Sequence, residues 1–152
     1  MKKVVAIIGG GVIGAGWLAR FLINGWDVRV FDTDRDAERK IDEVLSNARR
    51  NLPMLYDFKL PEEGGLYFCS TLKDAVEGAL WTQESVPERL DIKHEVLSEI
   101  QQYCKKRAVI GSSTSGFMAS QLQEKSSFPD QIMVCHPFNP VYLLPLVEVV
   151  PG

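Results

Sequence analysis

Apolar residues along this chain occur in two kinds of pattern, short continuous runs and segments of helical spacing. The run Val4–Ile8 is typical of a parallel strand buried on both faces. In the segment that follows, apolar residues recur every three to four positions: Ile13, Trp17, Leu18 and Phe21. Gly25 follows this segment, and a glycine is common directly after the last residue of a helix. The start of the chain therefore predicts a strand, a turn and a helix.

The same alternation continues to the end of the chain. Further strands are expected at Val28–Phe31, Leu66–Cys69, Leu80–Glu84, Ala108–Ile110, Gln131–Cys135 and Leu146–Val150. Helices are expected around Ile41–Ala48, at Leu72–Glu77, after a capping box formed by Ser85 and Glu88 up to Tyr103, and at Phe117–Lys125. Residues 51–65, with several prolines and glycines, predict a surface excursion. Strands that alternate with helices predict an α/β fold, a Rossmann-like doubly wound sheet that is mostly parallel.

Length and composition limit the classes of protein. The 152 residues suit one domain, residues 1–152, and 45% hydrophobic with 24% charged residues is typical of a globular chain. A net charge of −3, with basic and acidic residues interspersed, disfavours a nucleic acid partner. The three cysteines, Cys69, Cys104 and Cys135, have no metal-binding or redox spacing. We therefore expect no metal site, and a reducing compartment, the cytoplasm.

Two apolar segments resemble targeting or membrane segments only in part. Met1–Lys3 followed by apolar residues imitates a secretory signal, but glycines interrupt the run from Gly9 on and Arg20 lies where a spanning helix would be in hydrocarbon. Near the other end, Val141–Val150 is too short to span and contains Pro145. No membrane partner is expected.

The turn after the first strand carries a phosphate-binding pattern. Gly9, Gly11 and Gly14 form G-x-G-x-x-G, in which the first glycine permits the tight turn, the second lets backbone approach a pyrophosphate, and the third lets helix and strand pack closely. Gly10, Val12 and Ile13 complete this candidate cofactor-binding segment. The strand before it and the helix after it are the context that the motif needs.

Asp32 ends the next strand, 18 positions after Gly14. An acidic residue at about this offset binds the ribose hydroxyls of NAD and repels the 2′-phosphate of NADP, so the sequence predicts NAD as the cofactor. Asp34 adds to this repulsion despite Arg35. The structural alternative is a plain glycine turn with Asp32 as a helix cap.

The chain has two histidines with different surroundings. His94 lies between Lys93 and Glu95 in a predicted helix, where a surface position is expected. His136 follows a predicted strand and should stand at the carboxyl edge of the sheet, where such folds bind ligands. It is a candidate general base, because an imidazole can take the proton of an alcohol while hydride leaves the same carbon. The alternative is a buried structural histidine.

Several motifs together resemble the 3-hydroxyacyl-CoA dehydrogenase superfamily. They are GGGVIG with Asp32, then QESVPERL, GSSTSG and HPFNPVYLLPLVEVV, and their wording is most similar to the L-carnitine dehydrogenase branch. The resemblance covers essentially the whole chain. It implies that His136 is the catalytic base and that Glu148, 12 residues later, is its carboxylate partner.

The resemblance also implies roles for four other residues. Ser115 and Asn139 match positions that contact the substrate oxygen and the nicotinamide side of the cofactor; locally, a helix N-cap and a turn before Pro140 are the alternatives. Glu84 matches an acidic residue that contacts the cofactor; the alternative is that it only begins a loop. Arg89 matches a position that is often basic, although exposed helix surface is slightly favoured.

The implied reaction is NAD-dependent oxidation of a small 3-hydroxy acid, L-carnitine to 3-dehydrocarnitine. A 3-hydroxyacyl-CoA substrate is the alternative, weakened because segment 35–50 has mixed charge where acyl-CoA enzymes carry many lysines. The other alternative is a protein that keeps the fold but catalyses no reaction. Because relatives continue into a helical domain that closes the cleft and forms a homodimer, this chain is expected to be an amino-terminal module with poor turnover alone.

Overall fold

The computed structural model describes residues 3–152. Met1 and Lys2, part of the targeting alternative, lie outside the described residues. The elements are β1 (Val4–Ile8), α1 (Val12–Ile23), β2 (Asp27–Phe31), α2 (Ala37–Asn51), η1 (Leu52–Leu55), β3 (Leu66–Phe68), α3 (Leu72–Val76), β4 (Trp81–Glu84), α4 (Leu90–Tyr103), β5 (Val109–Ser112), α5 (Ala119–Gln123), η2 (Pro129–Gln131), β6 (Ile132–Pro137) and β7 (Val147–Pro151).

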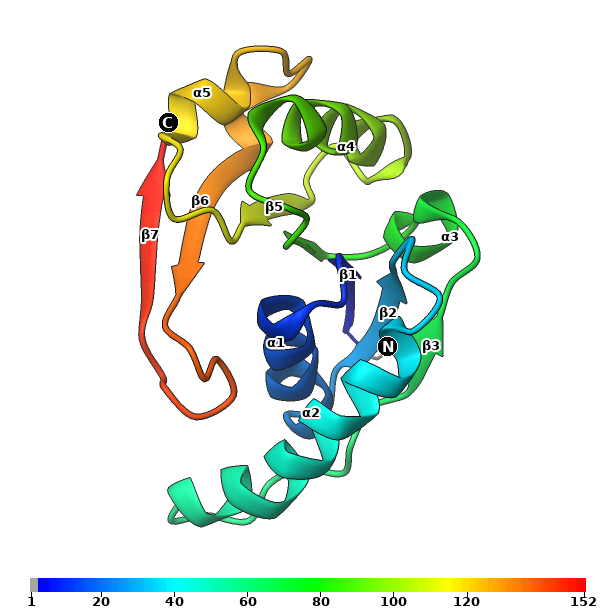
Figure 1. Cartoon of the computed structure of the whole chain (residues 1–152), viewed down its shortest axis with the longest axis vertical. Coiled ribbons are helices and arrows are strands. Elements are labelled where there is room, and N and C mark those ends of the chain that lie inside the picture. Colours follow the sequence, from blue (N-terminus) through cyan, green and yellow to red (C-terminus); the bar gives the residue numbers. More distant parts are fainter. Residues whose placement is uncertain (1–2) are drawn as a thin grey trace.

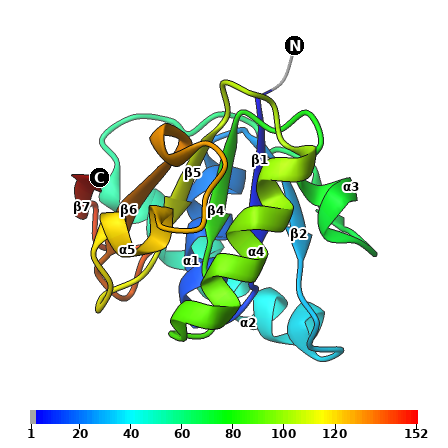
Figure 2. The same ribbon diagram turned by 90° about the horizontal axis from the view of Figure 1, so that it is seen from above.

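The strands form one seven-stranded sheet in the order β3-β2-β1-β4-β5-β6-β7. β1 to β6 run parallel, and β7 pairs antiparallel with β6. The chain leaves β1 toward β2 and β3 (Figure 1), and later returns to place β4 on the other side of β1 (Figure 2). This reversal confirms the predicted doubly wound fold, and it opens a ligand-binding crevice at the carboxyl ends of β1 and β4.

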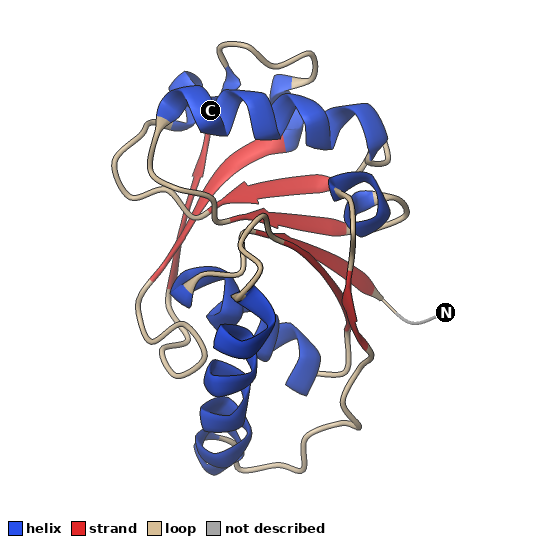
Figure 3. Cartoon of the chain, turned by 45° about the vertical axis from the view of Figure 1, so that its right-hand side comes forward, coloured by secondary structure: helices blue, strands red, loops and turns tan. Residues whose placement is uncertain are grey.

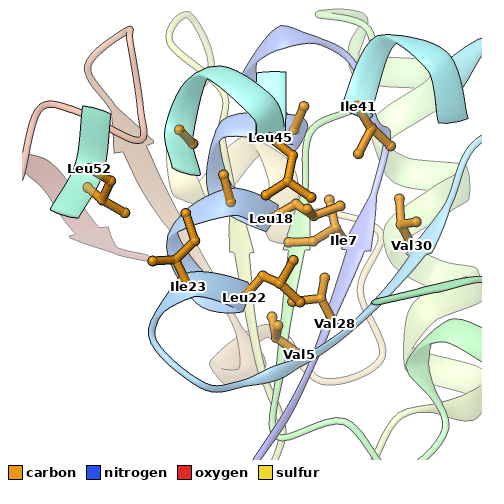
Figure 4. Close-up of a cluster of buried hydrophobic side chains, with 13 residues drawn as sticks. Val5, Ile7, Leu18, Leu22, Ile23, Val28, Val30, Ile41, Leu45 and Leu52 are labelled. Carbon is orange, nitrogen blue, oxygen red and sulfur yellow. The ribbon is translucent and has the colours of Figure 1, made fainter. Parts of the chain in front are cut away.

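Helices cover both faces of the sheet (Figure 3). On one face, α1 and α2 pack on β1 and β2, and their buried side chains form one core with Ile7, Leu18 and Leu45 at its centre (Figure 4). On the other face α3, α4 and α5 form a row, with Leu97 and Ile110 in a second core (Figure 2). Burial on both faces explains why β1 is a continuous apolar run.

Several element boundaries differ from the prediction. The helix expected from the Ser85 and Glu88 capping box begins only at Leu90, with Arg89 at its N-cap, so that capping box is wrong. The helix expected at Phe117–Lys125 is shorter, Ala119–Gln123. Residues 51–65 are mostly irregular, as predicted, apart from η1.

Among residues 3–152, no helix has the length and apolarity that crossing a bilayer requires.

Candidate functional site

The carboxyl ends of the parallel strands bring the predicted site residues to one edge of the sheet. β1 leads into the glycine turn, β2 into Asp32, and β5 into the loop that carries Ser115. His136 lies in the last part of β6. Residues more than a hundred positions apart in the sequence therefore share one rim.

The glycine turn has no room for side chains at two of its three motif positions. Gly9 has φ +93°, and a Cβ there would lie 2.6 Å from the backbone oxygen of Ser85. A Cβ on Gly14 would lie 1.8 Å from the oxygen of Gly9. A Cβ on Gly11 would meet no atom within 4 Å. The space above Gly11 is therefore open to a ligand at the start of α1, as pyrophosphate binding requires.

Asp32 holds the same turn from the end of β2. Its Oδ2 accepts a hydrogen bond of 2.5 Å from the amide of Gly10, and its Oδ1 accepts one of 2.7 Å from the amide of Asp34. Asp36, not Asp32, precedes α2, so the helix-cap alternative for Asp32 is wrong. The carboxylate lies on the cleft wall, where a ribose would meet it.

A cleft of about 700 Å³ runs over this turn. Gly9, Gly10, Gly11, Asp32 and Ser85 are among its lining residues. The backbone at the start of α1 is open to a pyrophosphate, and the Asp32 carboxylate, 18 positions after Gly14, is placed to meet a ribose. The volume of the cleft also suits a dinucleotide. Val12 and Ile13 continue the motif into α1 but do not line the cleft.

His136 and Glu148 face each other across the antiparallel pair β6 and β7. The two residues are direct partners in the strand register, and His136 Nδ1 lies 2.9 Å from Glu148 Oε2. The side chain of His136 is 27% exposed and that of Glu148 59% exposed. Nδ1–H donates to the carboxylate, and Nε2 has no partner among residues 3–152, so this nitrogen is available to a ligand.

A second cavity, of about 480 Å³, adjoins this pair. His136, Glu148, Ser115 and Phe117 line it. Ser115 lies four residues before α5, whose N-cap is Met118, so the N-cap alternative for Ser115 is wrong. Asn139 lies on the exposed loop after β6, lines neither cavity, and precedes a turn in which the oxygen of Pro140 accepts from the amides of Leu143 and Leu144.

The structure corrects the expected role of Glu84. Its side chain is fully buried, and Oε1 accepts from the Lys93 ammonium at 2.8 Å and from the amide of Val86 at 2.8 Å. Oε2 accepts a short hydrogen bond from the Ser112 hydroxyl. A carboxylate so enclosed cannot touch a cofactor in the cleft, so the predicted side-chain contact of Glu84 is wrong.

Glu88 connects the same buried cluster to the Ser115 loop. Its Oε2 lies 3.3 Å from Lys93 Nζ, and its Oε1 accepts from the Thr114 hydroxyl and from the amides of Ser115, at 3.1 Å, and Gly116, at 3.0 Å. Partial burial alone would raise the pKa of Glu88, but the hydrogen bonds from Thr114 and Gly116 and the Lys93 charge outweigh it and lower this pKa.

Sequence reasoning missed this cluster, although one signal was present. Lys93 lies on the same helical stripe as Leu97 and Ile100 of α4, and its side chain is 1% exposed. A lysine within an apolar stripe indicates a buried cation that needs carboxylate partners.

Two further predictions have different outcomes. His94 is not at the surface: it is 7% exposed, and its Nε2 lies 2.7 Å from the oxygen of Gln121. The surface prediction for His94 rested on its charged neighbours Lys93 and Glu95, and it is wrong because the imidazole faces α5. Arg89 lies on the surface, where its guanidinium binds the Asp91 carboxylate at 2.6 Å. The residue lines neither cavity, in agreement with the surface alternative.

The chain is similar to known proteins of one family. A family model described as 3-hydroxyacyl-CoA dehydrogenase, NAD binding domain, matches residues 4–152. An L-carnitine dehydrogenase/betainyl-CoA thioesterase of Ruegeria pomeroyi is 66% identical over 145 residues, 95% of this chain and 30% of that protein. An L-carnitine dehydrogenase of Oceanobacillus iheyensis is 45% identical over 152 residues, 100% of this chain and 49% of that protein. The chain thus spans less than half the length of these relatives.

Solved structures share the fold. An NAD+-dependent dismutase, 5-formyl-3-hydroxy-2-methylpyridine 4-carboxylic acid 5-dehydrogenase, superposes with a TM-score of 0.87 at 32% identity, covering 98% of this chain and 48% of that one. A 3-hydroxybutyryl-CoA dehydrogenase from Escherichia coli K12 superposes with a TM-score of 0.82 at 21% identity, covering 98% of this chain and 32% of that one. Both superpositions confirm the Rossmann-like fold. The family match, together with the NAD+-dependent dismutase, confirms NAD as the cofactor.

Proposed function

The chain belongs to the 3-hydroxyacyl-CoA dehydrogenase family as its NAD-binding domain, and from this membership we propose that the intact protein oxidises the hydroxyl of a 3-hydroxy acid. The substrate is L-carnitine and the product 3-dehydrocarnitine. Support for this substrate comes from relatives named L-carnitine dehydrogenase, which are up to 66% identical to this chain.

One observation carries the catalytic part of the proposal, the 2.9 Å contact of His136 Nδ1 with Glu148 beside a cavity. With Nδ1–H held by the carboxylate, Nε2 carries a lone pair and can accept the substrate hydroxyl proton. Glu148 then stabilises the imidazolium that forms. When bound, NAD supplies the acceptor for the hydride that leaves the same carbon.

The remaining side chains orient the reactants. Ser115 lines the cavity beside His136, where its hydroxyl can donate to the substrate oxygen as that oxygen becomes a carbonyl. Asn139 is proposed for the nicotinamide side on the resemblance of its HPFNP segment alone. Asp32 and the Gly9–Gly14 turn bind the adenosine ribose and the pyrophosphate.

A second candidate substrate is a 3-hydroxyacyl-CoA, favoured by the name of the matching family. To separate the two, the intact protein is given NAD with L-carnitine and, in parallel, with 3-hydroxybutyryl-CoA, and the absorbance of NADH at ~340 nm is followed. The proposal expects a kcat/KM for L-carnitine at least ~100-fold above that for the acyl-CoA. A reversed ratio would transfer the assignment to the acyl-CoA, and no NADH from either substrate would sink the dehydrogenase proposal.

A further inference from the structure

A row of hydrogen bonds crosses the ends of β4 and β5 next to the glycine turn. Trp81 Nε1 donates to Gln83 Oε1 at 3.0 Å, and Gln83 Nε2 donates to Ser113 Oγ at 2.9 Å. Ser113 Oγ in turn lies 2.8 Å from Ser85 Oγ. These four side chains form the serine relay, which neither the family membership nor the catalytic pair uses.

The relay is a built feature of the core. The Gln83 side chain is fully buried, and its neighbour in the strand register is Gly111. A Cβ on Gly111 would lie 2.8 Å from Gln83 Oε1 and 2.8 Å from the Trp81 ring. A residue without a side chain therefore stands where the relay needs space.

The chemistry of its first member sets the direction of the relay. An indole N–H only donates, so the oxygen of the Gln83 amide faces Trp81 and its NH₂ group faces Ser113. Ser113 Oγ thus accepts from Gln83. The Ser113 and Ser85 hydroxyls carry two hydrogens, and their mutual hydrogen bond uses one. The other has no acceptor among residues 3–152, so the pair presents a hydrogen-bond donor to whatever lies beside it.

The position of the pair identifies what it meets. Ser85 lines the 700 Å³ cleft together with Gly9–Gly11, and Thr114 and Ser115, next to Ser113, line the cavity of His136. In the sheet, β4 and β5 lie between β1 and β6, whereas Asp32 follows β2 on the opposite side of β1. The serine pair thus lies between the pyrophosphate turn and the general base, away from the adenosine end.

We propose that the serine relay is a binding element for the nicotinamide half of the dinucleotide, to which the Ser85 and Ser113 pair donates one hydrogen bond. The acceptor is an oxygen of the nicotinamide nucleoside or of its phosphate. The inference rests only on the dinucleotide-binding part of the proposed function and is independent of the substrate.

Calorimetric titration of the intact protein with NADH and with ADP tests the relay. ADP reaches the glycine turn and Asp32 but lacks the nicotinamide half. Because either hydroxyl alone would still have a hydrogen to donate, both are removed. The double variant Ser85→Ala/Ser113→Ala is expected to weaken NADH binding by about three- to tenfold, the usual effect of one neutral hydrogen bond, and to leave ADP binding unchanged. Ser46→Ala, on the exposed face of α2, is the matched control and should bind both ligands like the unmodified protein.

Unchanged NADH affinity in the double alanine variant, or equal losses for NADH and ADP, would overturn the relay. Failure of the unmodified protein to bind NADH would instead overturn the dinucleotide-binding proposal itself.

Discussion

The imidazole of His136 and the carboxylate of Glu148 are direct partners across the β6 and β7 pair, with 2.9 Å between Nδ1 and Oε2. Opposite residues in an antiparallel pair have their side chains on the same face, so the register of two strands sets this contact. The proposed base therefore takes its orientation from the edge of the sheet, and it needs β7 in place.

Glu148→Gln should lower kcat in the intact protein by roughly 10²-fold, at the low end of what acid–base groups contribute. The amide can hold the ring but cannot stabilise an imidazolium by charge. Steady-state kinetics with the preferred substrate measure the effect. Glu124→Gln, an exposed residue after α5, is the control and should keep full kcat. A Glu148→Gln enzyme with unaltered kcat would remove Glu148 from the mechanism.

Asp32→Ser should weaken NADH binding by about 10- to 100-fold, because a charged acceptor for the ribose hydroxyls is lost. NADPH binding should fall less or improve, since the repulsion of its 2′-phosphate is relieved. The nearby Asp34 carboxylate is already paired with Lys40 at 2.6 Å and does not replace that repulsion. Fluorescence titration with both cofactors gives the ratio of affinities; an unchanged ratio would contradict the assignment of Asp32.

Glu88→Gln should destabilise the protein in a pH-dependent manner. The folded-state pKa of Glu88 is lowered, so its contribution to the free energy of unfolding is present above the ordinary glutamate pKa and is lost as pH falls through the folded-state value. Urea unfolding at about pH 7 and about pH 3.5 measures this. The stability difference between the two proteins should shrink at the lower pH. A difference that is the same at both would mean that Glu88 acts without its charge.

Burial raises the pKa of the Cys135 thiol to about 11. At pH ~8 only about one molecule in 10³ carries the reactive thiolate there, so iodoacetamide should label Cys135 far more slowly in the folded protein than in urea. Peptide mass spectrometry reports the labelling of each cysteine. Equal rates in both conditions would show that the thiol is not enclosed.

Local signals were sufficient to predict most of the fold. The run Val4–Ile8, the glycine turn and the helical spacing after it are properties of neighbouring residues, and the structure has all three elements in place. Family membership and NAD as cofactor are likewise confirmed. The helix start expected at Ser85 and Glu88 is wrong because Ser85 and Glu88 bind residues of the β5 loop, some 27 positions away, rather than each other.

Contacts between distant segments were beyond local reasoning. The apolar stripe of α4 marks Lys93 as a buried cation, but no local pattern identifies Glu84 as its partner or places Ser112 against the same carboxylate. His94 is buried for a similar reason, since the oxygen that it contacts belongs to Gln121. The pairing of His136 with Glu148 was expected only through the family resemblance, because the loop between β6 and β7 has no regular period from which to count a register.

Replacement of His136 by Gln in the intact protein tests the central claim most directly, when kcat and the dissociation constant of NADH are measured on the same preparation. The account predicts that kcat falls by about 10³-fold or more while NADH binds as in the unmodified protein, because the ring acts on the substrate hydroxyl and the glycine turn binds the cofactor. Turnover that survives the substitution would contradict it.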